Sequence, residues 1–221
     1  MKQQNKIDFA LRDRSMFDTE KLVIRKTGDR LICSYDNEKF YFDTLVHGIY
    51  PTSKEYSLKY ILAILNSKPA TYFYRCLHDI KGKVFAKISL DDLSCFPIPE
   101  CTDQQPFIDL ADKMLSLNRD LQAKRARFLR RLQDNMPTIK ITGTLESFDT
   151  LDFAGFVAEL KKQKIKLSLV QQDEWEEYFS QYKTACTELT SAISATDAEI
   201  DARVYDLYGL TDDERQLIAN M

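Results

Sequence analysis

Three residues of this chain have the types and the order found in metal-dependent nucleases. Asp152, Glu159 and Lys161 reproduce a D…ExK arrangement, whose carboxylates bind a metal ion. In nucleases these ligands usually lie on adjacent strands. Here Glu159 and Lys161 belong to a helical pattern and are two residues apart, so they point to different faces of one helix. We therefore interpret them as a solvated helix surface.

Other catalytic patterns are absent from the sequence. It contains no glycine-rich phosphate loop, no HExxH and no GxSxG. His47 and His78 have no partner at the spacing of a metal site or a triad, and we interpret them as ordinary surface or strand histidines. The five cysteines are an odd number without a CxxC pair, which argues against disulfides and structural zinc. We expect no enzyme activity, no metal and no cofactor in this chain.

The composition is that of a globular protein. The chain has 221 residues, of which 44% are hydrophobic, enough for one large domain or two small ones. Its longest apolar run, Tyr60 to Leu65, is far too short to span a membrane, and the start MKQQNKIDFA lacks the apolar core of a signal peptide. We expect a cytoplasmic protein.

Charge is divided unevenly along the chain. Residues 21–87 contain 12 Lys and Arg against 6 Asp and Glu, a net charge of +6, whereas residues 88–221 have a net charge of -9. This division fits a protein that contacts a polyanion with one part only, although such a split also occurs without a function.

The first half has the pattern of a small mixed α/β unit. Residues 20–26 and 29–36 are apolar and β-branched runs around Thr27-Gly28, which predicts a hairpin, and residues 39–46 predict a third strand. From Ser57 the apolar spacing becomes helical. A break at residues 66–69 separates this helix from a short second one, and residues 80–93 predict a basic loop around Gly82 followed by a strand.

Pro97 and Pro99 mark the boundary between two architectures. Proline fixes its own backbone angle and disfavours helix at the preceding residue, so this stretch is extended. Thr102 or Asp103 then provides a helix cap, with Pro106 in the first turn. We accordingly divide the chain into a mixed α/β unit, residues 1–101, and a helical region of coiled-coil type, residues 102–221.

Two long helices are predicted in the second half, one from Phe107 to Phe128 and one from Trp175 to Leu207. Their apolar residues recur at a spacing near 3.5, as in helices that pack along a seam. Antiparallel pairing within the chain is our interpretation; the alternatives are a seam onto another chain or two unrelated helices. A short helix is expected around Phe156, and Gly209 and Thr211 to Glu214 predict a helix stop and a capping box.

A basic run on the first of these helices has two interpretations. Lys124, Arg125, Arg127, Arg130 and Arg131 either contact phosphate or form a solvated helix end that pairs with the acidic partner helix. The acidic residues around Trp175 are most simply the solvated side of that helix.

Several elements in order resemble the TaqI-like C-terminal specificity domain, the target-recognition region of many adenine DNA methyltransferases and fused restriction-modification enzymes. They are the LNS element at Leu65 to Ser67, the FPIP element at Phe96 to Pro99, and the glutamine before a long helix. The step from prolines to glutamine to helix is also similar to type I specificity subunits. The segment Glu199 to Glu214 resembles the C-terminal end of such enzymes.

The resemblance implies an α+β fold and DNA recognition without catalysis. The partners would be double-stranded DNA and a methyltransferase or endonuclease catalytic domain or subunit, and S-adenosylmethionine and Mg²⁺ would belong to that catalytic part. The catalytic motifs of the methyltransferase half are missing here, so we expect either a piece of a longer enzyme or a separate specificity polypeptide. The alternative is a helical protein–protein interaction or scaffold module without autonomous DNA binding.

Under this interpretation, basic side chains of the first half neutralise phosphates while a few others read base edges. Near the hairpin we expect Arg25, Lys26, Arg30 and Lys39 to contact DNA, and in the later loop Lys81, Lys83 and Lys87. Tyr35 and Tyr41 are candidates for stacking or sugar contacts. For each of them the alternative is a solvated strand edge, where lysine prevents unwanted pairing.

Overall fold

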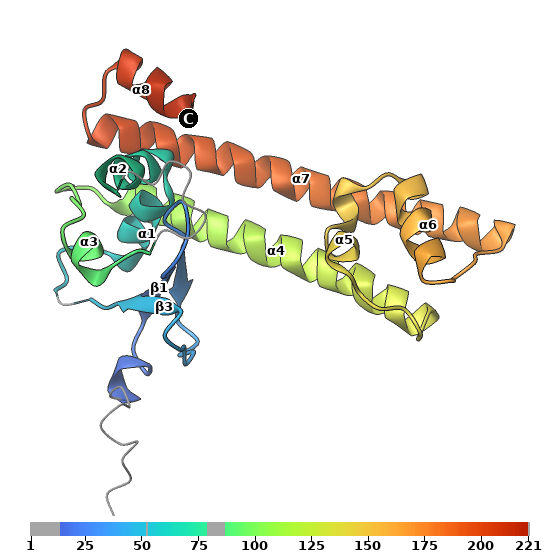
Figure 1. Cartoon of the computed structure of the whole chain (residues 1–221). Coiled ribbons are helices and arrows are strands. Elements are labelled where there is room, and N and C mark those ends of the chain that lie inside the picture. The colour runs from blue at the N-terminus through green and yellow to red at the C-terminus, as the bar shows by residue number, and fades with distance from the viewer. Residues whose placement is uncertain (1–13, 52, 79–86, 221) are drawn as a thin grey trace, which may run out of the picture. The chain divides into compact units, whose positions relative to one another are not determined.

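The computed structural model describes residues 14–51, 53–78 and 87–220, which divide into two compact units (Figure 1). Unit 1 comprises Met1–Asp112 and Glu199–Met221, and unit 2 comprises Lys113–Ala198. The sequence-based division into residues 1–101 and 102–221 follows the order of the chain. In the structure, by contrast, the last segment groups with the first.

Unit 1 contains a three-stranded antiparallel sheet, which follows a short 3-10 helix, η2 (Arg14–Met16). Its strands are β1 (Lys21–Arg25), β2 (Cys33–Asp36) and β3 (Val46–Ile49), in the order β2-β1-β3. The predicted hairpin is confirmed, since β1 pairs with β2 in antiparallel register, Leu22 opposite Tyr35.

The strand predicted at residues 39–46 is wrong. The chain forms a loop there, and β3 begins only at Val46. The carboxylate of Asp36 accepts the amides of Glu38 and Phe40, and Lys39 has a φ of 63°, so the backbone turns away from extended geometry. An Asp side chain that bonds the amides after it competes with strand pairing, and this turn chemistry overrides the β-forming residues that follow.

Two helices pack in unit 1 as predicted. Helix α1 (Leu58–Asn66) is capped by the Ser57 side chain and packs on β1 and β2, and α2 (Lys68–His78) follows directly after Ser67. The Asn66 side chain ties the end of α1 to the sheet, because it bonds both the amide and the carbonyl of Cys33. The hydroxyl of Tyr60 donates to the carbonyl of Pro99 at 2.8 Å.

The strand predicted after the Gly82 loop is not present in the described residues. Lys87 forms a single β-bridge with Thr27, and Leu90–Ser94 forms a short helix, α3. The loop itself lies outside the described residues.

The predicted boundary at the prolines is an extended segment that leads into α4 (Gln105–Asn135). Pro106 lies in the first turn, and the Asp103 carboxylate accepts the amide of Gln105. Gln104 fastens this entry to the start of α1: its side chain accepts the amide of Ser57 at 2.8 Å and donates to the carbonyl of Glu55 at 2.7 Å. Because both bonds link distant parts of the chain, Gln104 fixes where α4 begins.

The C-terminal segment closes on unit 1. Helix α7 (Leu169–Leu207) stops before Gly209, whose φ is +63°, and α8 (Asp212–Ala219) opens with the predicted capping box of Thr211 and Glu214. The hydroxyl of Tyr208 donates to the carbonyl of Pro97 at 2.7 Å, so the segment is held to the boundary that precedes α4.

Unit 2 is built on one stretch of α4 and one of α7. Residues of both stretches share a buried core, and Phe128 stands opposite Trp175 and Tyr182 in antiparallel arrangement, as predicted. The connection contributes α5 (Gly143–Glu146), a 3-10 helix η3 (Phe148–Thr150) and α6 (Phe153–Lys162). The fold class is therefore α+β, as expected. None of the described helices is long and apolar enough to cross a bilayer.

Candidate nucleic-acid interface

Helix α1 covers one face of the sheet of unit 1, and the other face is exposed at the Arg25 end of β1. Side chains alternate along a strand, so Leu22 and Ile24 point to one face and Val23 and Arg25 to the other. Leu22 and Ile24 are fully buried on the side where α1 packs, whereas Arg25 is exposed. Arg25 thus lies on the face opposite to α1.

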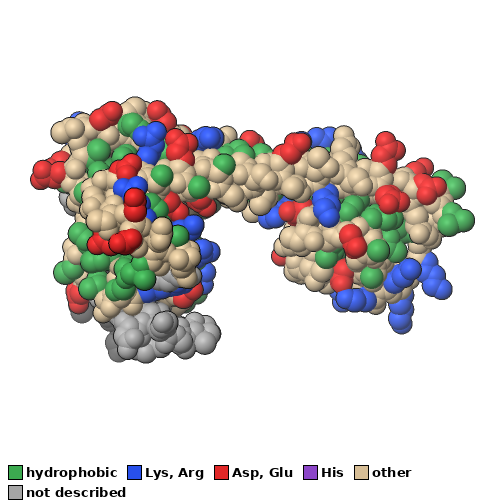
Figure 2. Space-filling view, turned by 90° about the horizontal axis from the view of Figure 1, so that it is seen from above, with side chains coloured by type: hydrophobic (Ala, Val, Ile, Leu, Met, Phe, Trp, Pro, Cys, Tyr) green, Lys and Arg blue, Asp and Glu red, His purple; other side chains and the backbone are tan. Residues whose placement is uncertain are grey.

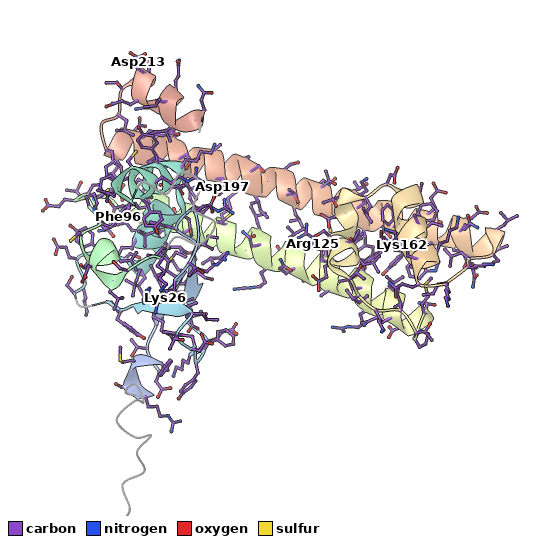
Figure 3. The ribbon with its side chains drawn as sticks, in the orientation of Figure 1. Lys26, Phe96, Arg125, Lys162, Asp197 and Asp213 are labelled. Carbon is purple, nitrogen blue, oxygen red and sulfur yellow. The ribbon has the colours of Figure 1, made fainter. Side chains whose placement is uncertain are left out.

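Four of the predicted DNA-contacting residues gather around one end of β1. We call them the sheet-end cations: Arg25, Lys26, Arg30 and Lys87. The amide of Lys26 donates to the carbonyl of Leu45 at 2.9 Å, and the carbonyl of Lys26 accepts the amide of Ile88 at 2.8 Å. These bonds and the Thr27–Lys87 bridge hold Lys87 beside Lys26, although the two residues are far apart in sequence. Figure 3 shows Lys26 at this sheet.

The sheet-end cations keep their charge available. None of them forms an ion pair with another residue that the structure describes, and three are exposed while Lys26 is partly exposed. A nearby acid is occupied by another cation. Asp29, in the turn beside Arg30, accepts one bond from Arg75 at its carboxylate and a second at its backbone carbonyl. Among the described residues, this end of the sheet therefore carries positive charge without an ion-pair partner.

The loop of residues 37–45 begins at the other end of β1, where a buried ion pair fastens it, and ends at Leu45 beside Lys26. Lys21 Nζ lies 2.6 Å from Asp36 Oδ2 and also donates to the carbonyl of Phe17 at 2.9 Å. Asp36 uses its two oxygens on the amides of Glu38 and Phe40 as well. Because a buried charge is retained only when it is paired and hydrogen-bonded, this network fixes the loop firmly.

The loop presents apolar side chains to solvent. Phe40 is 62% exposed, Tyr41 61% and Leu45 68%. Tyr41 is stacked on the buried Phe17 with ring centroids 4.6 Å apart, so its ring is oriented although it is exposed. Lys39 lies in the same loop and is exposed. It lies near Asp36, at the opposite end of β1 from the sheet-end cations, and is therefore not one of them. Exposed aromatic rings on a fixed loop are suited to stacking on bases or wedging between them.

Tyr35 lies on the covered face of the sheet. It stands opposite Leu22, and the Nζ atom of Lys59 on α1 is 5.5 Å from its ring centroid. Burial, followed by a hydrogen bond to Glu20, raises the pKa of Tyr35 to about 12. The structure therefore separates Tyr35 from Arg25, with which the sequence grouped it. Two further predicted residues, Lys81 and Lys83, lie outside the described residues.

The nuclease-like residues serve structural purposes in α6. The Asp152 side chain caps the helix by accepting the amide of Gly155 at 2.7 Å, and Glu159 pairs with Lys162. Among the residues that the structure describes, no group of three or more His, Cys, Asp or Glu could hold a metal ion. His47 lies in β3, buried, with Nε2 2.9 Å from the carbonyl oxygen of Ile88.

Unit 1 also has an apolar hollow of about 300 Å³. Residues of α2 and α8 form its walls together with Phe96, whose ring meets that of Phe73 edge to face at 5.3 Å. Leu217, at its border, is 59% exposed.

Sequence reasoning missed the exposed loop, because its aromatic residues were assigned to a strand. The stretch Asp36-Asn37-Glu38 before them was a signal for a turn, since Asp and Asn side chains favour one. The ion pair of Asp29 with Arg75 could not be predicted from the sequence, because the two residues are 46 positions apart.

The fold defines a class of protein, a small α+β unit followed by long helices, whose described residues include a cluster of basic side chains at one end of the sheet. Residues 1–98 match the TaqI-like C-terminal specificity domain, so the resemblance drawn from the sequence is confirmed for this part of the chain. This family is a specificity domain and not a catalytic one. Residues 100–204 match a domain of unknown function, DUF8810. No curated protein and no solved structure matches the chain.

Proposed function

We propose that this chain is the sequence-specific DNA-recognition module of a restriction-modification system. The observation that carries the proposal is the cluster of sheet-end cations, which have no ion-pair partner among the described residues and lie within residues 1–98, the part that matches a specificity domain. Phosphate neutralisation by such side chains supplies affinity, and contacts to base edges supply sequence preference.

In this proposal the chemistry belongs to a partner. A methyltransferase or endonuclease domain or subunit binds S-adenosylmethionine or Mg²⁺ and modifies or cuts DNA in the cytoplasm. The unit within residues 1–101 reads the DNA, and the helical residues 102–221 connect it to that partner. Extrusion of a target base would be driven jointly with the catalytic part.

The test is fluorescence anisotropy with random duplex DNA at increasing salt concentrations. The proposal predicts weak binding whose logarithm falls steeply with the logarithm of salt concentration, and a shallower slope when Arg25, Lys26 and Lys87 are all changed to Gln. A matched control changes Lys140, Lys161 and Lys166 to Gln, since these three lysines are exposed in unit 2 and the net charge becomes the same. Absence of binding at low salt, or equal slopes for both variants, would contradict the proposed site.

A second candidate is a protein–protein interaction module that does not bind DNA. The apolar hollow beside Phe96 favours it, because an exposed Leu217 at the border of an apolar surface is typical of a docking site. The same titration distinguishes the two functions: only the DNA-recognition module shows salt-dependent affinity for the duplex.

A further inference from the structure

We infer that unit 2 carries a second binding surface for the phosphate backbone of DNA, on the exposed face of α4. It consists of Arg119, Arg127, Arg130 and Arg131, which we call the arginine stripe. The inference deepens the proposed function, because it assigns the same ligand to a part of the chain whose matching family has no known function.

The position of these residues along the helix places them together. In an α-helix residues three, four, seven or eight apart share a face, so Arg119, Arg127 and Arg130 lie on one side of α4. The buried residues Leu121, Phe128 and Leu132 occupy the opposite side, against the core of unit 2. All four arginines are exposed.

Arg125, on the same helix, differs from the stripe because its side chain is paired within unit 2. Arg125 points toward η3 and forms two bonds with the carboxylate of Asp149, at 2.9 and 2.7 Å, and Figure 3 shows it on α4 near α5. It therefore belongs to the internal packing of unit 2 and is not part of the stripe.

Pairing with the acidic stretch of α7 does not account for the stripe. Among the described residues, no ion pair joins these arginines to Asp173, Glu174, Glu176 or Glu177. Within the described ranges their one ion pair is the contact of Arg131 with Asp134, at 3.9 Å, and the Arg131 side chain remains 60% exposed. Arg131 lines a hollow together with Glu174, and the structure describes no ion pair between them. Ion pairing with the partner helix is therefore not observed among the described residues, and the guanidinium groups of the stripe are left for an external anion in our inference.

The side chains between the arginines are small and leave a shallow hollow. Ala123 and Ala126, together with Arg127, Arg130, Arg131 and Asp134, line an open hollow of about 500 Å³. Small side chains here allow a sugar–phosphate chain to approach the helix while guanidinium groups reach its phosphates. The planar guanidinium matches a phosphate group with two parallel hydrogen bonds, which lysine cannot form.

The length of the stripe fits several phosphates. From Arg119 to Arg131 the helix rises about 18 Å, at about 1.5 Å per residue. One DNA strand advances about 3.4 Å along the duplex axis per phosphate, so the stripe is long enough for its arginines to reach more than one phosphate.

The test compares three variants of the full chain in the salt titration. Changing Arg127, Arg130 and Arg131 to Gln should lower the magnitude of the log–log salt slope by about 2 to 3, since each phosphate contact contributes about 0.9. The control with Lys140, Lys161 and Lys166 changed to Gln should leave the slope within about 0.5. Lys161 lies in the last turn of α6. Figure 2 shows where Lys and Arg side chains gather on the surface.

The outcomes separate this inference from the proposed function. An unchanged slope in the arginine variant, with a shallower slope when the sheet-end cations are replaced, overturns the stripe and leaves the function standing. A shallower slope in the arginine variant alone supports the stripe and contradicts the sheet-end site. No binding of the unaltered chain at low salt overturns both. Circular dichroism of each variant verifies that the helices remain folded.

Discussion

Lys21 Nζ lies 2.6 Å from Asp36 Oδ2, and both side chains are almost completely buried on the face of the sheet opposite to α1. The pair joins β1 to β2 and, through the Asp36 carboxylate, to the loop that exposes Phe40. Burying this charged pair lowers the stability of the fold, because two apolar residues of similar size would pack there at a lower desolvation cost. In exchange, the pair fixes the position of the loop.

Replacing Lys21 with Met should destabilise the protein by about 3–5 kcal/mol, because the carboxylate of Asp36 is left buried without a counterion. Denaturation in urea, followed by circular dichroism, measures the free energy of unfolding. The matched control is Arg75 to Met, which removes the more exposed pair with Asp29 and should cost about 1 kcal/mol or less. Equal losses in the two variants would contradict the assigned role of the buried pair.

Replacing Phe40 with Ala should weaken DNA binding about fivefold or more while leaving the salt slope unchanged, since stacking on a base contributes about 1–3 kcal/mol without releasing counterions. Anisotropy at several salt concentrations separates the two effects. Leu90 to Ala is the control, because this leucine is 60% exposed on α3, outside the loop. A lower slope for the Phe40 variant, or the same affinity loss in the control, would count against a stacking contact.

Replacing Phe128 with Ala should destabilise unit 2 by about 3–5 kcal/mol. Its ring is fully buried and stacks on that of Phe148 with centroids 3.8 Å apart, while Trp175 meets it edge to face at 6.1 Å. Trp175 is the one tryptophan of the chain, so its fluorescence during denaturation reports on this unit. The Phe40 to Ala variant should leave that transition in place; a similar shift in both would show that the aromatic cluster is not specifically responsible.

Arg125 to Lys should behave almost like Arg125 to Ala. The guanidinium holds both oxygens of Asp149, whose side chain is only 6% exposed, and this bonding raises the pKa of Arg125. Lysine retains the charge and loses the two-bond geometry, so we expect each variant to lose about 2 kcal/mol or more. Full stability of the lysine variant in thermal denaturation would mean that charge alone is sufficient.

The stability of the folded protein should decline above about pH 9. Burial raises the pKa of Cys33 to about 12, so the unfolded chain releases this proton at a lower pH than the folded chain does. The folded state then binds more protons, and the free energy of unfolding falls as pH rises from about 9 toward 12. Urea denaturation at pH 8 and pH 10.5 measures the loss, and a Cys33 to Val variant should show a smaller one.

Thiol labelling provides a separate check of the same burial. At pH 8 a thiol reagent should modify Cys76 and Cys95, which are exposed, and should spare Cys33 and Cys186, which are buried. Mass spectrometry of the labelled protein identifies the sites. Rapid modification of Cys33 in the native state would contradict its raised pKa.

The sequence was most informative where local rules decide the structure. The helical period of α1, the two prolines before α4 and the capping box of Thr211 with Glu214 each follow from neighbouring residues, and all were predicted. The loop after Asp36 was mistaken for a strand, since strand propensity outweighed turn chemistry in our interpretation. The exposed ring of Phe40 was missed for that reason.

The sequence predicted which residues belong to the candidate site, but not which of them lie close together in the fold. Arg25, Lys26 and Lys87 were expected to bind DNA, but their gathering depends on the bridge between Thr27 and Lys87, which is a contact across 60 positions. Tyr35 was placed with them because strand alternation alone does not say which face a helix covers.

Unit 1 consists of two segments that are synthesised at different times, because the whole of unit 2 lies between them in the sequence. Tyr208, whose hydroxyl donates to the Pro97 carbonyl, is synthesised only after all of unit 2. Unit 2 is one continuous stretch of the chain and can therefore fold first. Unit 1 is complete only after residues 199–221 have been synthesised, because Leu210 and Ile218 form part of its apolar hollow. A fragment that stops at Asp112 would keep every sheet-end cation and leave this apolar surface open to aggregation.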